Sequence, residues 1–152
     1  MNAVGFFKTH HPDVKCSKDI NDFFSNEAIN EVELSMIVSY LEKGVPVISL
    51  ISDLYEEGER IGPNIIYSDG LWIWPSYYSV YLKKYPRLTI PDEFIQHVKL
   101  NKDKPLGLSL IERKYTQYLL TKLLYIRLAT GFKLPEDVDE MVNIRGEVIQ
   151  CY

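Results

Sequence analysis

Cysteine is scarce in this chain, with Cys16 and Cys151 near opposite ends and no CxxC pair or Cys/His cluster. Zinc sites need ligands at defined short spacings, and these two residues do not supply them. A disulfide would require both ends of the chain to meet. We therefore interpret the two cysteines as free thiols in a reducing compartment, and we expect a cytoplasmic protein.

Long apolar runs are also missing. No segment approaches the roughly 18 apolar residues that a membrane-spanning helix needs. The first residues, Met1–Lys8, lack the charged start and the long apolar centre of a signal peptide. The sequence therefore predicts no membrane partner.

Motifs for catalysis and cofactor binding are absent as well. The glycines are isolated, so no GxGxxG or P-loop grouping is present to cradle a phosphate, and no GxSxG motif occurs. His10–Asp13 and Cys16 carry metal-ligating side chains, but adjacent histidines before a proline point in different directions. We predict no catalytic residue, no cofactor and no metal site, and we interpret His97 as a structural histidine.

A basic excess is lacking, because the net charge is −4. Residues 1–76 hold five basic and twelve acidic residues, whereas residues 77–152 hold twelve basic and nine acidic ones. Basic residues and tyrosines mix at 83–87, a pattern able to hold single-stranded RNA, but the acidic overall balance argues against a nucleic-acid partner. An acidic half favours encounter with a basic protein instead.

What the sequence contains is the composition of a globular domain. Hydrophobic residues make up 46% and charged residues 25%, and a length of 152 residues corresponds to one domain. Asn30, followed three residues later by glutamate, is typical of a helix start. Helices are expected, from periodicity, caps and prolines, at 17–24, 30–44, 75–85, 91–98 and 109–130.

The remaining segments complete the predicted fold. Val45–Ile51 is rich in β-branched residues and favours a strand. Residues 1–16 are irregular by pattern, and residues 141–152 fit either a helix or a strand pair. We predict an α+β fold, a helix-rich single domain over residues 1–152 with a small antiparallel sheet.

Asn64–Trp74 is the strongest local signal in the chain. Asp69-Gly70 between two apolar runs favours a hairpin with a type I′ turn, whose two central residues need positive φ. Counting outward, this turn pairs Tyr67 with Trp72, and Pro75 starts a helix directly afterwards. Alternation places Ile65, Tyr67, Trp72 and Trp74 on one face and Ile66 and Ile73 on the other. Because both faces are apolar, we expect other elements to cover both.

The most acidic stretch lies just before this hairpin. Residues 53–59 hold four carboxylates and a tyrosine within seven positions. Exposed loops carry contacts because they are shaped independently of the core, so this stretch is our first candidate for a docking loop. A solvated hairpin loop is an equally good interpretation, and both stay open.

One string of residues resembles a known family. The string is Asp69-Gly70-x-Trp72-x-Trp74-Pro75, then Tyr77, Tyr81 and Tyr85, then Ile90-Pro91-x-Glu93-Phe94-x-x-His97. It resembles a pattern of small bacterial immunity proteins from polymorphic toxin and contact-dependent growth inhibition (CDI) systems, over about a quarter of the chain. The resemblance implies a non-catalytic cytoplasmic protein that binds and neutralises the C-terminal domain of a cognate toxin, often a nuclease. A ribonuclease is our specific guess, by analogy with the family.

The expected mechanism is occlusion of the toxin's active site within a 1:1 heterodimer formed by a monomer of this chain. Carboxylates reach into a cationic cleft, while aromatic side chains act as desolvated anchors. The predicted partner-binding residues are Asp53, Tyr55, Glu56, Glu57, Glu59, Asp69, Trp72 and Trp74. Two alternatives stay open: a small enzyme with an acidic site in a pocket beside the hairpin, and an interaction subunit unrelated to toxins.

Overall fold

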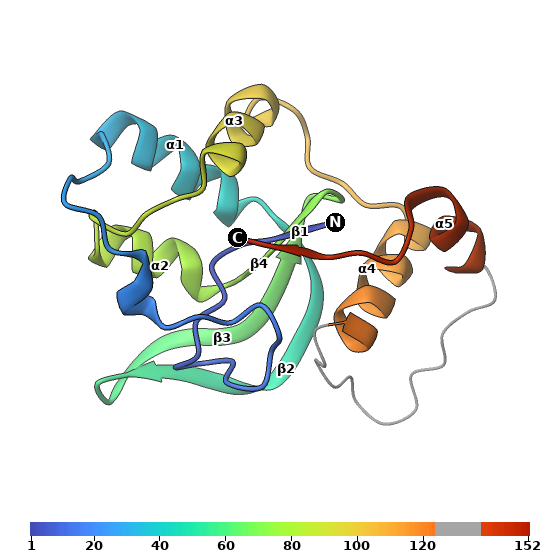
Figure 1. The fold of residues 1–152 in the computed structure, drawn as a ribbon, viewed down its shortest axis with the longest axis horizontal. Helices are drawn as coiled ribbons and strands as arrows, with labels where there is room; N and C mark the ends of the chain where they lie inside the picture. The colour runs from blue at the N-terminus through green and yellow to red at the C-terminus, as the bar shows by residue number, and fades with distance from the viewer. Residues whose placement is uncertain (124–137) are drawn as a thin grey trace.

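The structure is a computed structural model that describes residues 1–123 and 138–152. The described part combines helices with one sheet, and the α+β class predicted from the sequence is confirmed (Figure 1). In chain order its elements are β1 (Asn2–Ala3), η1 (Ile20–Phe23), α1 (Glu31–Glu42), β2 (Val45–Glu56), β3 (Glu59–Ser68), β4 (Trp72–Pro75), α2 (Tyr77–Lys84), α3 (Asp92–Asn101), α4 (Leu110–Leu123), α5 (Val138–Arg145) and β5 (Gln150–Cys151).

The sheet has the strand order β2-β3-β4-β1-β5. Strands β2, β3 and β4 run antiparallel, but β1 is parallel to both β4 and β5. The sheet is therefore mixed: its predicted antiparallel part is present, and the parallel pairs of β1 add to it. The two-residue strand β1 lies in the segment that the sequence pattern presents as irregular, because its pairing partners are remote in the chain.

The β3–β4 hairpin forms, but its register differs from the prediction. Tyr67 faces Trp74 rather than Trp72, and Ser68 faces Ile73. The Asp69 carboxylate accepts hydrogen bonds from the backbone N–H groups of Leu71 and Trp72, both at 2.8 Å, which widens the turn. Among the non-glycine residues described, positive φ occurs at Glu57 alone, so the predicted type I′ turn at Asp69-Gly70 is wrong.

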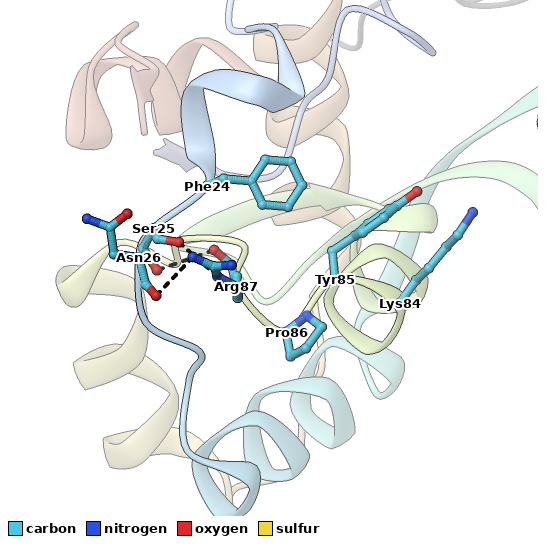
Figure 2. Close-up of a pocket in the computed structure, with 7 residues that line it drawn as sticks. All are labelled: Phe24, Ser25, Asn26, Lys84, Tyr85, Pro86 and Arg87. Atoms are coloured by element: carbon cyan, nitrogen blue, oxygen red, sulfur yellow. Dashed lines mark hydrogen bonds between the residues drawn. The ribbon is translucent and has the colours of Figure 1, made fainter.

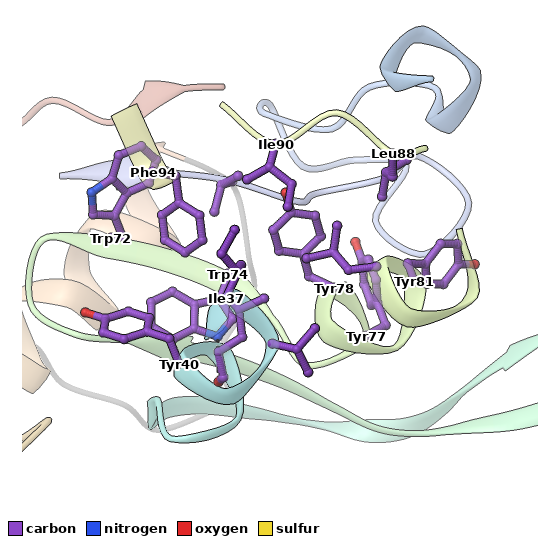
Figure 3. Packing of buried hydrophobic residues seen from close by; sticks show 14 of the residues in the cluster. Ile37, Tyr40, Trp72, Trp74, Tyr77, Tyr78, Tyr81, Leu88, Ile90 and Phe94 are labelled. Atoms are coloured by element: carbon purple, nitrogen blue, oxygen red, sulfur yellow. Dashed lines mark hydrogen bonds between the residues drawn. The ribbon is translucent and has the colours of Figure 1, made fainter. Parts of the chain in front are cut away.

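The register shift leaves the predicted faces of the hairpin intact. Because the shift is two residues, each side chain stays on its original side of the sheet. Trp72 and Trp74 lie in a core with α1, α2 and α3, while Ile66 and Ile73 lie in a second core with residues of β2 and α4. The prediction that both faces are covered is confirmed. Figure 3 shows the first of these cores, which is rich in aromatic side chains.

The type I′ geometry occurs instead at the turn between β2 and β3. Glu57 and Gly58 have φ values of 51° and 86°, and Glu56 faces Glu59 across the turn. The predicted docking loop at residues 53–59 is therefore the end of a long hairpin. A register shift between Ser49 and Asp53 leaves the side chain of Ile51 fully exposed.

Helix α1 begins as its sequence predicts and ends against a tryptophan. The Asn30 side chain accepts hydrogen bonds from the backbone of Val32 and Glu33, as expected of an N-cap. Just beyond the helix, a Cβ on Gly44 would lie 2.4 Å from the ring of Trp74, so this close approach requires glycine. Helix α2 starts two residues later than predicted, because Pro75 ends β4 instead of starting the helix.

The end of the chain returns to the sheet. Residues 141–152, left open between helix and strand, contain the end of α5 and strand β5. Strand β5 pairs with β1 and brings Cys151 to Cys16, where the two form a disulfide with a Cα–Cα distance of 5.2 Å. The interpretation as free thiols is wrong, because the two ends of the chain share one sheet. The predicted helix beyond Leu123, up to Thr130, lies outside the described residues.

Candidate functional site

The β2–β3 hairpin extends past the other strands and carries most of the predicted partner-binding residues (Figure 1). We call Asp53, Tyr55, Glu56, Glu57 and Glu59 the acidic tip. Tyr55 is 56% exposed although its ring is large and apolar. The structure thus brings these five residues together on one hairpin end, with the exposed Ile51 beside them.

Glu56 fixes the acidic tip to helix α2. Its Oε1 accepts a hydrogen bond from the Tyr85 hydroxyl at 2.8 Å, and its Oε2 accepts one from Lys84 Nζ at 2.7 Å. Partial burial acts to raise the pKa of Glu56, but the hydrogen bonds from Lys84 and Tyr85 together lower it. Because both carboxylate oxygens of Glu56 already accept hydrogen bonds within the chain, this residue holds the hairpin in place and is less available to a partner.

The other carboxylates of the acidic tip differ in how far they are neutralised. Asp53 accepts two hydrogen bonds from the Arg60 guanidinium, at 2.6 and 3.0 Å. Glu57 is 83% exposed and lies 3.8 Å from Lys84, and Glu59 is exposed with no ion pair to any residue that the structure describes. The negative charge available to a partner is therefore mainly that of Glu57 and Glu59.

Asp69 is not part of this surface. Its side chain is only 2% exposed, and its Oδ2 lies 2.7 Å from both the Tyr40 hydroxyl and His97 Nε2. Burial acts to raise the pKa of Asp69, but the hydrogen bonds from His97, the backbone and Tyr40 lower it overall. The prediction of Asp69 as a partner-binding residue is therefore wrong for the folded chain. His97 has the structural role expected of it.

Trp72 and Trp74 are also buried, at 3% and 1% exposure. The ring of Trp72 packs against Phe94, with centroids 4.9 Å apart (Figure 3). Trp74 Nε1 donates a hydrogen bond to the Leu41 carbonyl. Neither tryptophan is accessible as an anchor for a partner, which corrects that prediction. The family-like string thus builds the scaffold, and the acidic tip lies outside it.

The two N-terminal histidines form a polar network with tyrosine and asparagine side chains. His11 contacts the Tyr77 hydroxyl and the Asn64 side chain, both at 3.1 Å, and His10 contacts the Tyr81 hydroxyl at 2.7 Å. Burial lowers the pKa of His11 to about 4, so it is neutral near pH 7. No cluster of three potential metal ligands occurs among the described residues.

A pocket next to the acidic tip was not foreseen from the sequence. It has a volume of about 420 Å³ and lies where the end of α2 meets the segment after η1 (Figure 2). Phe24, Tyr85 and Pro86 form apolar walls, with Lys84 and Arg87 beside them. The basic run at 83–87 was visible in the sequence, but nothing indicated that residues 24–26 fold against it.

The pocket and the acidic tip form one continuous surface. Lys84 and Tyr85 line the pocket, and the same two side chains hold Glu56 of the hairpin. The ring of Tyr85 packs edge to face against the ring of Phe24, with centroids 5.8 Å apart. The acidic tip and the pocket therefore share the side chains of Lys84 and Tyr85.

Comparisons with known proteins add no relative. No protein family model matches the chain, and neither the curated proteins nor the solved structures gave a significant match. Within residues 1–123 and 138–152, no helix is long and apolar enough to cross a membrane.

Proposed function

We propose that this chain is an inhibitory binding protein of the immunity type, which neutralises the C-terminal domain of a cognate toxin by covering its active site. One observation carries the proposal: a projecting hairpin ends in two exposed carboxylates, Glu59, which forms no ion pair with a described residue, and Glu57, which has only a long contact of 3.8 Å to Lys84. The exposed side chains of Tyr55 and Ile51 lie on the same hairpin. The family resemblance of the sequence supports the same function.

The acidic tip suits a cationic cleft. A toxin that cleaves nucleic acid needs positive charge to bind phosphates, and the carboxylates of Glu57 and Glu59 meet that charge in place of the substrate. Tyr55 adds a large apolar surface with a polar end, a side chain enriched at interfaces. A ribonuclease remains the specific guess within this proposal.

The hairpin is held in place before any partner arrives. Lys84 and Tyr85 fix Glu56, and Arg60 fixes Asp53, so less conformational entropy is lost when a partner binds. We propose a 1:1 heterodimer in the cytoplasm of the producing cell, with no catalytic role for this chain. The disulfide between Cys16 and Cys151 argues against the cytoplasmic part of this proposal, because such bonds are rare in the cytosol.

Co-expression with the product of the adjacent reading frame tests the proposal. The neighbour is expected to stop growth when expressed alone and to be harmless when this chain is present. Protection is expected to fall in the double variant E57K/E59K and to persist in the matched control E93K/D103K, whose carboxylates are exposed but lie on and after α3. A harmless neighbour, or equal protection by both variants, contradicts the proposal.

A further inference from the structure

Arg87 is held by backbone carbonyls and pairs with no carboxylate of the residues that the structure describes. Its Nε donates a hydrogen bond to the Ser25 carbonyl at 3.2 Å, and its Nη2 donates one to the Asn26 carbonyl at 3.0 Å. Both acceptors are neutral, and no ion pair joins Arg87 to a carboxylate of the described residues. The exposed guanidinium is therefore oriented by two backbone carbonyls, and no carboxylate of the described residues pairs with it.

The space next to Arg87 has aromatic walls. Phe24 is 44% exposed and meets Tyr85 at an interplanar angle of 90°, so their rings form two sides of a corner (Figure 2). The pocket volume of about 420 Å³ lies within the usual range for sites that bind small molecules or single anchoring side chains. An aromatic ring fits such walls through edge-to-face contacts.

The positive charge of the pocket lining favours an occupant that carries negative charge. Among the described residues, the lining contains two cations, Arg87 and Lys84, of which Lys84 is paired with Glu56, and no carboxylate. A purely apolar occupant would desolvate Arg87 without pairing it, which is unfavourable. A carboxylate pairs well with a guanidinium, since the planar fork matches its two oxygens.

We infer that this pocket binds an aromatic residue with an adjacent carboxylate, presented by the protein that covers the acidic tip. The inference rests on the proposed function and deepens it, because it requires a partner that carries both a carboxylate and cations on its contact surface. The partner places its carboxylate at Arg87 and its cations at Glu57 and Glu59. A nucleic acid is disfavoured, because these two glutamates repel a polyanion at the edge of the same surface.

The chemistry of the pocket is tested first with a small probe. N-acetyl-L-phenylalanine carries both a ring and a carboxylate, whereas its amide lacks the charge. In an NMR titration, the acid is expected to shift the signals of Phe24 and Arg87 with a dissociation constant on the order of 1 mM, as its size allows. The amide is expected to bind roughly tenfold more weakly. Equal binding of acid and amide, or no saturable shift at these residues, overturns the inference.

Matched variants assign the effect to the guanidinium fork. R87K keeps the charge but loses the fork, and it is expected to weaken the acid about tenfold and the amide little. R113K is the control, because Arg113 also donates to a backbone carbonyl, that of Pro46, but lies outside the pocket. F24A should weaken acid and amide alike. Far-UV circular dichroism confirms that each variant is folded, and R87K binding the acid as tightly as R113K overturns the inference.

A second arm asks whether the partner uses the pocket. R87E is expected to weaken the complex with the product of the adjacent reading frame at least tenfold, with R113E as control. If the probe binds but R87E leaves the affinity for that product unchanged, the partner assignment is overturned. If that product neither binds nor stops growth, the proposed function fails instead, and the probe titration still reports on the pocket itself.

Discussion

Asp69 is a single carboxylate that ties three elements together. Its donors come from the β3–β4 turn, from Tyr40 of α1 and from His97 of α3. A carboxylate that is 2% exposed is stable only if it is fully hydrogen-bonded and paired with a cation or a strong donor. The position of α1 and α3 over the sheet therefore depends on this residue.

Removing the charge of Asp69 is expected to destabilise the fold. D69N keeps the shape but presents an amide to donors arranged for a carboxylate, and the free energy of unfolding should fall by about 2–4 kcal/mol. Urea denaturation measures the change. D53N is the control, because Asp53 lies exposed at the acidic tip and its replacement should leave the urea midpoint unchanged. Equal midpoints for D69N and the unmodified chain would refute this role.

His11 predicts a loss of stability in weak acid. Its folded pKa, about 4, lies below the ordinary value of 6.5 because burial penalises the charged form. The stability that depends on neutral His11 is therefore present above pH 6.5 and is lost as the pH falls toward 4. Between pH 7 and pH 5 the loss is about 2 kcal/mol, measured by urea denaturation. H11Q should remove most of this pH dependence, and an unchanged slope would contradict the assignment.

Residue roles followed from the sequence only where they were local. Asn30 caps α1 as predicted, since a cap acts on the two or three residues that follow it. The roles of Asp69 and Trp72 depend on Tyr40, Phe94 and His97, which are remote in the chain. Spacing within a segment does not report such contacts, so the assignment of Trp72 and Trp74 to the partner-binding surface is wrong.

At the level of elements, the type I′ turn predicted at Asp69-Gly70 occurs at Glu57-Gly58 instead. Asp69-Gly70 has the stronger sequence signal for a type I′ turn, but the Asp69 carboxylate binds the backbone of its own turn and widens it. Glu57-Gly58 has the weaker signal and takes the type I′ form. The long β2–β3 pairing on both sides of Glu57-Gly58 outweighs its local preference.

Gly58 offers a direct test of this turn. Both Gly58 and Gly107 have open space where a Cβ would lie, but only Gly58 has a positive φ, +86°. G58A is therefore expected to lower the free energy of unfolding by about 1–2 kcal/mol through backbone strain alone. G107A is the matched control and should be neutral or slightly stabilising. Equal effects of the two substitutions in urea denaturation would argue against the assigned turn.

Helices were predicted better than strands. Periodicity, caps and prolines mark α1, α2 and α3 within their own segments, and the observed bounds lie close to those expected. Strands β1 and β5 are two residues each and exist only through pairing with one another and with β4. No local sequence pattern predicts a strand of only two residues.

At the level of the whole molecule, the disulfide closes the chain onto itself. It joins residues 135 positions apart, so reduction frees a large loop in the unfolded state. The double variant C16S/C151S is expected to lose about 2–5 kcal/mol of unfolding free energy. Urea denaturation of oxidised and reduced protein provides the control, because the reduced protein should match the variant. An oxidised protein no more stable than the variant would contradict this role.

The state of the same cysteines inside cells decides the compartment. The proposed cytoplasmic location requires free thiols, whereas the structure joins Cys16 and Cys151 in a disulfide, so rapid thiol trapping of the two residues decides between them. A trapped disulfide would place it in an oxidising compartment and would require the proposal to be revised.

The account as a whole depends on the acidic tip as the contact surface for a cationic protein. The dissociation constant between this chain and the product of the adjacent reading frame, measured by calorimetry at low and high salt, tests this most directly. We predict that E57K/E59K weakens the complex roughly 10- to 100-fold and reduces its salt dependence, while E93K/D103K changes neither. An affinity that is the same for E57K/E59K and the unmodified chain at both salt concentrations would contradict the account.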